Sequence, residues 1–118
     1  MNEYIYLIQE LRFIRTGENI YKVGKTTRGY DRIKEYAKGS RLLLFMNVSN
    51  CHEMEKLILI HLSLNFNKRT DIGREYFEGD HRSMIELIKS IKDVNIKDVN
   101  NESITKNIGT KKRCCFIM

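Results

Sequence analysis

The spacing of hydrophobic residues changes several times along this chain, and each change predicts a secondary-structure element. The run Tyr4-Ile5-Tyr6-Leu7-Ile8 is aromatic and β-branched, which is typical of a strand. A turn cluster at residues 16–19 separates it from a similar run at residues 20–24, and together they predict a β-hairpin. Residues 42–48 form a continuous apolar run, which predicts a central strand buried on both faces.

Helical spacing of apolar residues begins after the hairpin. It extends over residues 30–37, and Gly39 stands where a C′ glycine would end this helix. Asn50 and Glu53 have the spacing of a capping pair, which predicts a second helix that ends at about Leu64.

The last third of the chain divides into a structured and a polar part. Residues 75–77 predict a short strand, and Asp80 is placed to cap a final helix that ends at Ile91. The chain is polar after this point, so we expect a flexible tail at residues 93–118 and a folded domain at residues 1–92. The order of elements predicts an α+β fold with a small antiparallel sheet of about three strands flanked by helices.

Composition narrows the class of protein. With 42% hydrophobic and 31% charged residues, the chain has the balance of a folded globular domain. No apolar run reaches the roughly 18–20 residues of a membrane span, and the N-terminus does not resemble a secretory signal, so we expect an intracellular protein. Three cysteines form no disulfide framework, and with three scattered histidines they predict no zinc site.

The excess positive charge is concentrated in one segment. The formal net charge is +6, and residues 22–41 alone hold seven basic and two acidic side chains. This concentration favours an anion-binding face, with nucleic acid or an anionic membrane surface as the partner. The alternative is a solvated, lysine-rich surface without a specific ligand.

Strand geometry indicates which side chains of this segment meet. Alternation places Lys22 and Gly24 on one face of the second strand. If Tyr6 faces the same side, a phenol and an ammonium meet beside the following helix. Arg32 and Tyr36, four residues apart, share a stripe of that helix. A guanidinium is suited to holding a phosphodiester in two-pronged fashion, and a glycine allows the backbone to approach it closely.

The order and spacing of these motifs resemble the GIY-YIG nuclease superfamily over about residues 3–91. The chain is similar in particular to its phage and giant-virus DNA-binding branch, which reads Tyr-Lys-Ile-Gly-Lys-Thr where the nucleases read Tyr-Ile-Gly. Four pieces carry the resemblance: Tyr4-Ile5-Tyr6, Lys22-Val23-Gly24-Lys25-Thr26, Arg32 with Tyr36, and Glu75-Tyr76-Phe77.

The resemblance implies a set of functional side chains. Its catalytic positions fall on Tyr6, Lys22 and Arg32. Together with the basic segment, it implies DNA contacts by these residues: Lys22, Gly24, Lys25, Arg28, Arg32 and Tyr36.

The resemblance also implies a divalent metal ion, Mg²⁺ or Mn²⁺, held by Glu55 on the helix after the third strand. Asn67, twelve residues later, and Glu75 are further candidate ligands. Oxygen ligands and water suit these ions. The metal and a tyrosine would then activate water while the arginine steadies the phosphate. Glu55 could instead pair with Arg32 or lie exposed.

Two positions depart from the nuclease pattern, and one is Tyr4, which stands at the first signature glycine. Lys22 replaces the second signature tyrosine, and Tyr21 stands one position early, on the opposite face by strand parity. Two functions therefore stay open: a DNA-binding domain with metal-dependent endonuclease activity, and a non-catalytic DNA-binding or membrane-tethered interaction module on the same fold.

The C-terminus carries a separate motif. Cys115-Phe116-Ile117-Met118 matches the C-a-a-X prenylation pattern, Cys114 is a palmitoylation candidate, and residues 111–113 are basic. Together they predict a lipid anchor that holds the chain at a membrane in the host cytoplasm. The alternative is a chance match of a short pattern.

Overall fold

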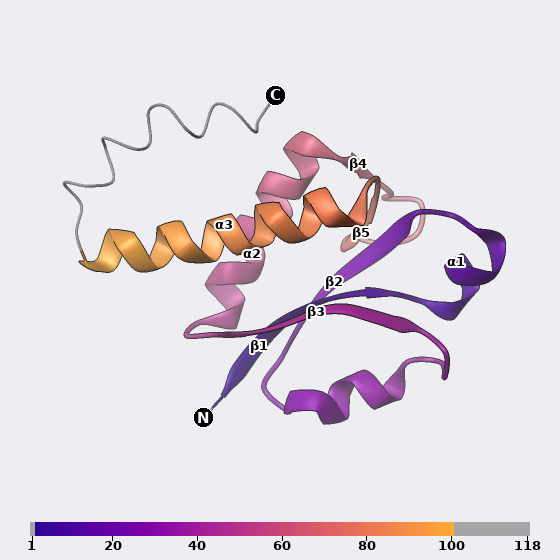
Figure 1. The fold of residues 1–118 in the computed structure, drawn as a ribbon, viewed down its shortest axis with the longest axis horizontal. Helices are drawn as coiled ribbons and strands as arrows, with labels where there is room; N and C mark the ends of the chain where they lie inside the picture. The colour runs from indigo at the N-terminus through magenta and orange to yellow at the C-terminus, as the bar shows by residue number, and fades with distance from the viewer. Residues whose placement is uncertain (1, 101–118) are drawn as a thin grey trace.

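The aromatic and β-branched run at the N-terminus lies near the centre of a five-stranded antiparallel sheet in a computed structural model, which describes residues 2–100 (Figure 1). For residues 94–100 only the backbone is described. The strand order is β3-β1-β2-β5-β4. The elements in chain order are β1 (Glu3–Gln9), α1 (Leu11–Thr16), β2 (Ile20–Thr26), the 3₁₀ helix η1 (Gly29–Glu35), β3 (Arg41–Val48), α2 (Cys51–Asn65), β4 (Asn67–Lys68), β5 (Tyr76–Glu78) and α3 (His81–Asn100). The predicted α+β class with a small antiparallel sheet is confirmed. β5 is the short strand expected at residues 75–77, and the two-residue strand β4 was not predicted.

The connection between β1 and β2 is longer than the expected hairpin turn. The two strands pair antiparallel as predicted, but the short helix α1 lies between them. It forms because Phe13 has a buried site to fill, and it ends at Gly17, which takes φ 75°. A six-residue helix with one buried side chain leaves too little periodicity to be recognised in the sequence.

The expected central strand β3 is instead an edge strand, paired only with β1. Most of its side chains are partly exposed. Its continuous apolar run arises because its side chains pack on two separate clusters. Leu44, Met46 and Val48 join the one beneath α2 and α3, and Leu42 and Phe45 join the one beneath η1.

The helix expected at residues 30–37 is the 3₁₀ helix η1, which ends at Glu35. Ile33 is its only buried side chain, so one face of one turn is anchored. Tyr36 is already extended, and Gly39 takes φ 102° in the turn that leads into β3 rather than directly closing the helix.

Helices α2 and α3 cover one face of the sheet, and η1 lies against the other (Figure 1). The larger core lies beneath α2 and α3 and contains the fully buried side chains of Ile5, Val23, Ile58, Phe77 and Ile88, among others. Burying this apolar surface supplies the main favourable contribution to folding.

Both predicted helix caps are present. The side chain of Asn50 accepts a hydrogen bond from the backbone N–H of Glu53, and that of Asp80 accepts one from Ser83. Helix α3 continues beyond the predicted end at Ile91 to Asn100, so its backbone enters the segment expected to be a tail. Among residues 2–100 no helix is both long and apolar enough to cross a membrane. Residues 101–118, and with them the lipidation candidates Cys114 and Cys115, lie outside the described residues.

Candidate nucleic-acid interface

Four side chains predicted to act together meet on the face of the sheet beside η1. We call Tyr6, Lys22, Arg32 and Tyr36 the phenol–cation cluster. The hydroxyls of Tyr6 and Tyr36 lie 2.8 Å apart in a hydrogen bond, and Arg32 Nη2 donates to Tyr36 Oη at 3.4 Å. The Tyr36 ring also lies 5.1 Å from Lys22 Nζ and 4.8 Å from Arg32 Cζ, both distances to the ring centroid. Two cations therefore share one aromatic ring, an arrangement that holds each in place.

The cluster forms because strand register and the turn of η1 agree. Tyr6 pairs with Gly24 across the two central strands, and Ile8 pairs with Lys22, so these alternate residues share a face. Although η1 is not an α-helix, Arg32 still reaches the hydroxyl of Tyr36, because Tyr36 turns back over the sheet as the helix ends.

Burial differs sharply between the two phenols. Tyr6 is 1% exposed beneath Tyr36, and burial followed by its hydrogen bond with Tyr36 raises the pKa of its hydroxyl well above the ordinary value. Tyr36 is half-buried, and burial raises the pKa of its hydroxyl as well. Both phenols therefore stay protonated at neutral pH, and only Tyr36 lies at the surface.

Gly24 serves the cluster differently from the expectation. A Cβ at this position would lie 2.3 Å from Cζ of Tyr6, so the ring of Tyr6 fills the space above the glycine. The missing side chain makes room for the phenol of Tyr6 rather than for a phosphate approaching the backbone.

Arg32 of the phenol–cation cluster and the nearby Arg28 share one acidic partner. Glu35 lies 2.8 Å from Arg28 and 3.3 Å from Arg32. The hydrogen bond from Arg28 holds the pKa of the Glu35 carboxyl below its usual range. Of the two arginines, Arg32 is the more enclosed, with 27% of its side chain exposed against 53% for Arg28.

Lys25 and Glu55 lie on the opposite face of the sheet from the phenol–cation cluster. Lys25 follows Gly24 on β2 and so points toward α2, where its Nζ contacts Glu55 Oε1 at 2.6 Å. Glu55 is buried at 6% exposed, and its Oε2 has no hydrogen-bond partner among the described residues. The structure therefore does not place the Glu55 carboxylate across from Tyr6 on the same face, as the sequence-based arrangement required.

The two further metal-ligand candidates, Glu75 and Asn67, lie in different parts of the structure. Glu75 is close to Glu55: burial and then the neighbouring Glu55 carboxylate raise the pKa of Glu75, while Lys22 and Lys25 oppose that rise. Asn67 follows the far end of α2, and its amide donates to Glu78. Ten helical residues at about 1.5 Å each keep Asn67 away from Glu55. Among the side chains of residues 2–93, no group of three or more His, Cys, Asp or Glu could hold a metal ion.

Sequence reasoning missed a second layer beside the cluster. Tyr76 pairs with Lys22 across β2 and β5, and its ring lies 5.8 Å from Lys22 Nζ and 5.7 Å from Arg12 Cζ. Its hydroxyl donates to Glu10 at 2.6 Å, and burial together with this bond raises the pKa of Tyr76 to about 12. Strand alternation carried the signal, because Phe77 faces the core and Tyr76 must face the other side.

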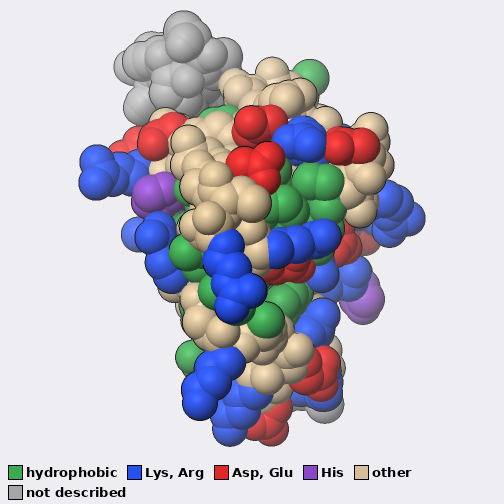
Figure 2. Space-filling model, turned by 90° about the vertical axis from the view of Figure 1, so that its right-hand side faces the viewer, with side chains coloured by type: hydrophobic (Ala, Val, Ile, Leu, Met, Phe, Trp, Pro, Cys, Tyr) green, Lys and Arg blue, Asp and Glu red, His purple; other side chains and the backbone are tan. Residues whose placement is uncertain are grey.

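Basic and acidic side chains are also distributed unevenly over the surface. Figure 2 shows the end of the molecule at the right of Figure 1, where basic side chains predominate in the lower half and acidic ones gather above. The lower half is at the height of η1, whose exposed residues include Lys34. Tyr30, also on η1, exposes 55% of its surface, so an aromatic ring stands beside these charges.

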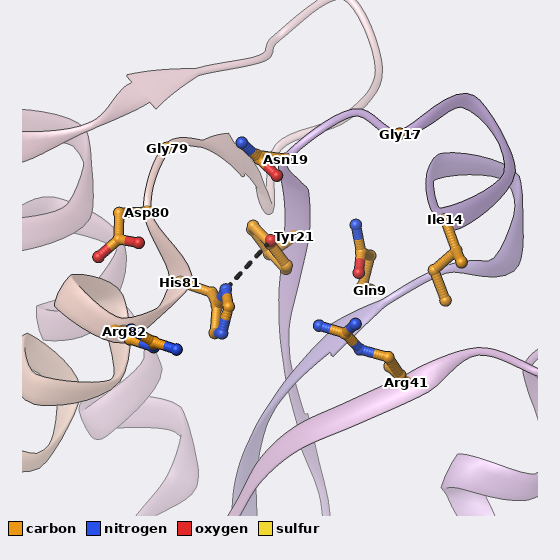
Figure 3. Close-up of a pocket in the computed structure, with 10 residues that line it drawn as sticks. All are labelled: Gln9, Ile14, Gly17, Asn19, Tyr21, Arg41, Gly79, Asp80, His81 and Arg82. Carbon is orange, nitrogen blue, oxygen red and sulfur yellow. Dashed lines mark hydrogen bonds between the residues drawn. The ribbon is translucent and has the colours of Figure 1, made fainter.

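A separate hollow of about 440 Å³ lies between the start of α3 and the end of α1 (Figure 3). Its lining includes the following polar side chains: Gln9, Asn19, Tyr21, Arg41, Asp80, His81 and Arg82. The hydroxyl of Tyr21 lies 3.3 Å from Nδ1 of His81, and burial raises the pKa of that hydroxyl. Tyr21 and Lys22 are neighbours on β2 and point to opposite faces, as predicted, so this hollow is not continuous with the phenol–cation cluster.

The small antiparallel sheet thus holds paired phenols, a lysine and an arginine on one face. Residues 3–92 match the T5orf172 domain, and the chain belongs to that family. This is a phage-associated domain of the GIY-YIG/HNH-like endonuclease class, and it is a DNA-binding or nuclease-like module. No curated protein and no solved structure matches the chain.

Proposed function

We propose that this domain binds the DNA backbone through the phenol–cation cluster. The observation that carries the proposal is the placement of Lys22 and Arg32 against the same half-buried ring of Tyr36. Holding two cations in fixed positions lowers the entropy cost of ordering them around a phosphate. An arginine fork matches a phosphodiester in two-pronged fashion, and a lysine adds a point charge beside it.

Neighbouring residues extend this surface. Arg28 and Lys34 add exposed positive charge along η1, as expected for contacts that follow a phosphate backbone. The exposed ring of Tyr30 offers a face on which an unpaired base can stack. Lys25 belongs to the opposite face, so we assign it no DNA contact.

The geometry favours binding over hydrolysis. Tyr6 is buried beneath Tyr36 with a raised pKa, so its hydroxyl is poorly placed to take a proton from water. Glu55 and Glu75 are chemically suited to a divalent cation, but one Glu55 oxygen is already held by Lys25 at 2.6 Å. The residues present therefore do not fit a metal ion in addition to this lysine.

A gel-shift titration at several salt concentrations tests the proposal. We expect the wild-type protein to shift duplex or single-stranded DNA with a steep salt dependence, because phosphate neutralisation releases counterions. Arg32→Ala should weaken binding about tenfold or more through the loss of a charged phosphate contact. Arg82→Ala is the matched control, since Arg82 is an exposed arginine on the α3 side and its loss should have little effect. Equal losses in both variants, or no shift at any salt, would contradict the proposal.

The endonuclease alternative is separated in the same preparation. Supercoiled plasmid is incubated with Mg²⁺, with Mn²⁺ or with EDTA. We expect retarded but uncut plasmid in all three conditions. Metal-dependent nicking that disappears in both Arg32→Ala and Glu55→Gln would show instead that the domain is a metal-dependent nuclease.

A further inference from the structure

The buried carboxylate of Glu55 has an unusual partner set. Glu55 is only 6% exposed, so an unpaired negative charge on its carboxylate would be strongly unfavourable. Lys25 Nζ contacts Oε1 at 2.6 Å, and no described residue donates to Oε2. A second carboxyl, Glu75, lies close by, and burial and then the Glu55 charge raise its pKa, so this site disfavours negative charge. A positive charge at this point is therefore required for stability, and the ammonium of Lys25 supplies it.

We propose that Lys25 is the permanent counter-ion of Glu55 and occupies the place of a divalent metal ion, so that the domain works without one. The role of Lys25 is inferred from its contact with Glu55 alone. The part that concerns DNA binding rests on the proposed function above.

The surroundings of Glu55 agree with an ammonium better than with a metal. Mg²⁺ requires about six oxygen ligands and usually keeps several waters. With the Lys25 ammonium against Oε1, such waters have little room around Glu55, whose side chain is 9% exposed. Among the described side chains of residues 2–93, no third His, Cys, Asp or Glu joins Glu55 and Glu75, so water would have to supply the other ligands. A lysine ammonium needs only hydrogen-bond acceptors, and the carboxylate offers them.

The position of Lys25 on β2 explains why an ammonium lies beside this carboxylate. Lys22 and Lys25 are three residues apart on β2, so they face opposite sides of the sheet. The basic segment therefore supplies one lysine to each face. Lys22 joins the phenol–cation cluster, and Lys25 neutralises the carboxylate beneath α2.

Mn²⁺ binding, measured by electron paramagnetic resonance, tests the inference without any activity assay. We expect wild-type protein to leave the signal of free Mn²⁺ unchanged and to melt at the same temperature in Mn²⁺ and in EDTA. Lys25→Met removes the ammonium, so this variant should take up about one Mn²⁺ per chain and melt at a higher temperature with the ion than without it. Lys25→Met/Glu55→Gln should do neither, and Lys34→Met, at an exposed lysine of η1, should behave as wild type.

Loss of the ion pair could prevent Lys25→Met from folding, and the design allows for that. Far-ultraviolet circular dichroism then follows a Mn²⁺ titration of this variant. Folding induced by Mn²⁺ supports the inference. A Lys25→Met chain that neither folds nor binds Mn²⁺, while the double variant folds, would overturn it. Stoichiometric Mn²⁺ uptake by the wild-type protein that is lost in Glu55→Gln would also overturn it.

The DNA arm is read separately, by gel shift of the wild-type protein in Mg²⁺ and in EDTA. Equal shifts in the two conditions support metal-free binding, and a shift that needs Mg²⁺ contradicts it. The absence of a shift in both conditions would remove the proposed function and, with it, the DNA extension, while the Mn²⁺ measurements would still decide the role of Lys25.

Discussion

The two faces of the sheet place similar residue types in opposite environments. On the α2 and α3 face, Tyr21 and the Lys25–Glu55 pair border a continuous apolar core. On the η1 face, Tyr6 is equally buried, but Lys22 lies over an aromatic ring at the surface. Lys25 is thus neutralised by a carboxylate on one face, whereas Lys22 on the other face can still contact a ligand. The comparison shows that charge counted along a sequence does not equal charge offered to a ligand.

The largest expected difference between the faces is in stability. Phe77 is completely buried beneath α2 and α3, so Phe77→Ala should lower the free energy of unfolding by about 3–5 kcal/mol. Chemical denaturation followed by circular dichroism measures the loss. Leu64→Ala is the control, because Leu64 is 76% exposed on α2 and its loss should change stability by less than about 0.5 kcal/mol. Similar losses in the two variants would contradict the assignment of the core.

A smaller and more local effect is expected at Gly24. Its added Cβ in Gly24→Ala would lie 2.3 Å from the Tyr6 ring, so the ring must move. We expect a loss of about 1–3 kcal/mol, the usual range for overpacking, together with weaker DNA binding because the cluster is displaced.

A double-mutant cycle separates the ring clash from other costs at this position. Once Tyr6→Ala has removed the ring, Gly24→Ala should cost much less than it does in the wild-type protein. Additive losses in the two single variants and the double variant would show that Tyr6 does not fill this space.

Removing one hydroxyl should have a smaller effect still. Tyr6→Phe deletes the hydrogen bond to Tyr36 and should cost about 1 kcal/mol of stability. Because Tyr36 keeps its contact with Arg32, DNA affinity should change little. Denaturation and gel shift together test this, and a large loss of affinity without loss of stability would assign Tyr6 a direct role at the ligand.

The pH dependence of the same phenol gives the last and smallest effect. The pKa of Tyr6 is raised in the folded protein above the ordinary value of 10.0, mainly by burial. Its contribution to stability is therefore complete below pH 10 and is lost as the pH rises from there toward the folded pKa. Unfolding titrations above pH 9 should show a shallower decline for Tyr6→Phe than for wild type, and identical slopes would contradict the assignment.

Local sequence signals predicted much of this fold. The pairing of β1 with β2, the caps at Asn50 and Asp80, and the placement of Tyr6 beside Lys22 all follow from alternation or from side chains near the elements they define. These features depend on residues close in sequence or on the parity of a single pair of strands.

Features that depend on the whole sheet were harder to predict. The apolar run of β3 gave no sign that the strand is at an edge, because both of its faces are covered. The position of Glu55 depends on which face α2 crosses after β3, and no local pattern specifies that choice. The expected site therefore divided into a cluster on one face and an ion pair on the other.

Glu35 has a consequence for how rapidly a ligand exchanges. Its carboxylate already spans Arg28 and Arg32 at 2.8 and 3.3 Å, much as a phosphate group would. An incoming anion must displace the Glu35 carboxylate from the two arginines, so binding replaces one negative group with another. We expect this competition to lower the affinity of the proposed DNA-binding surface for polyanions and to speed their release.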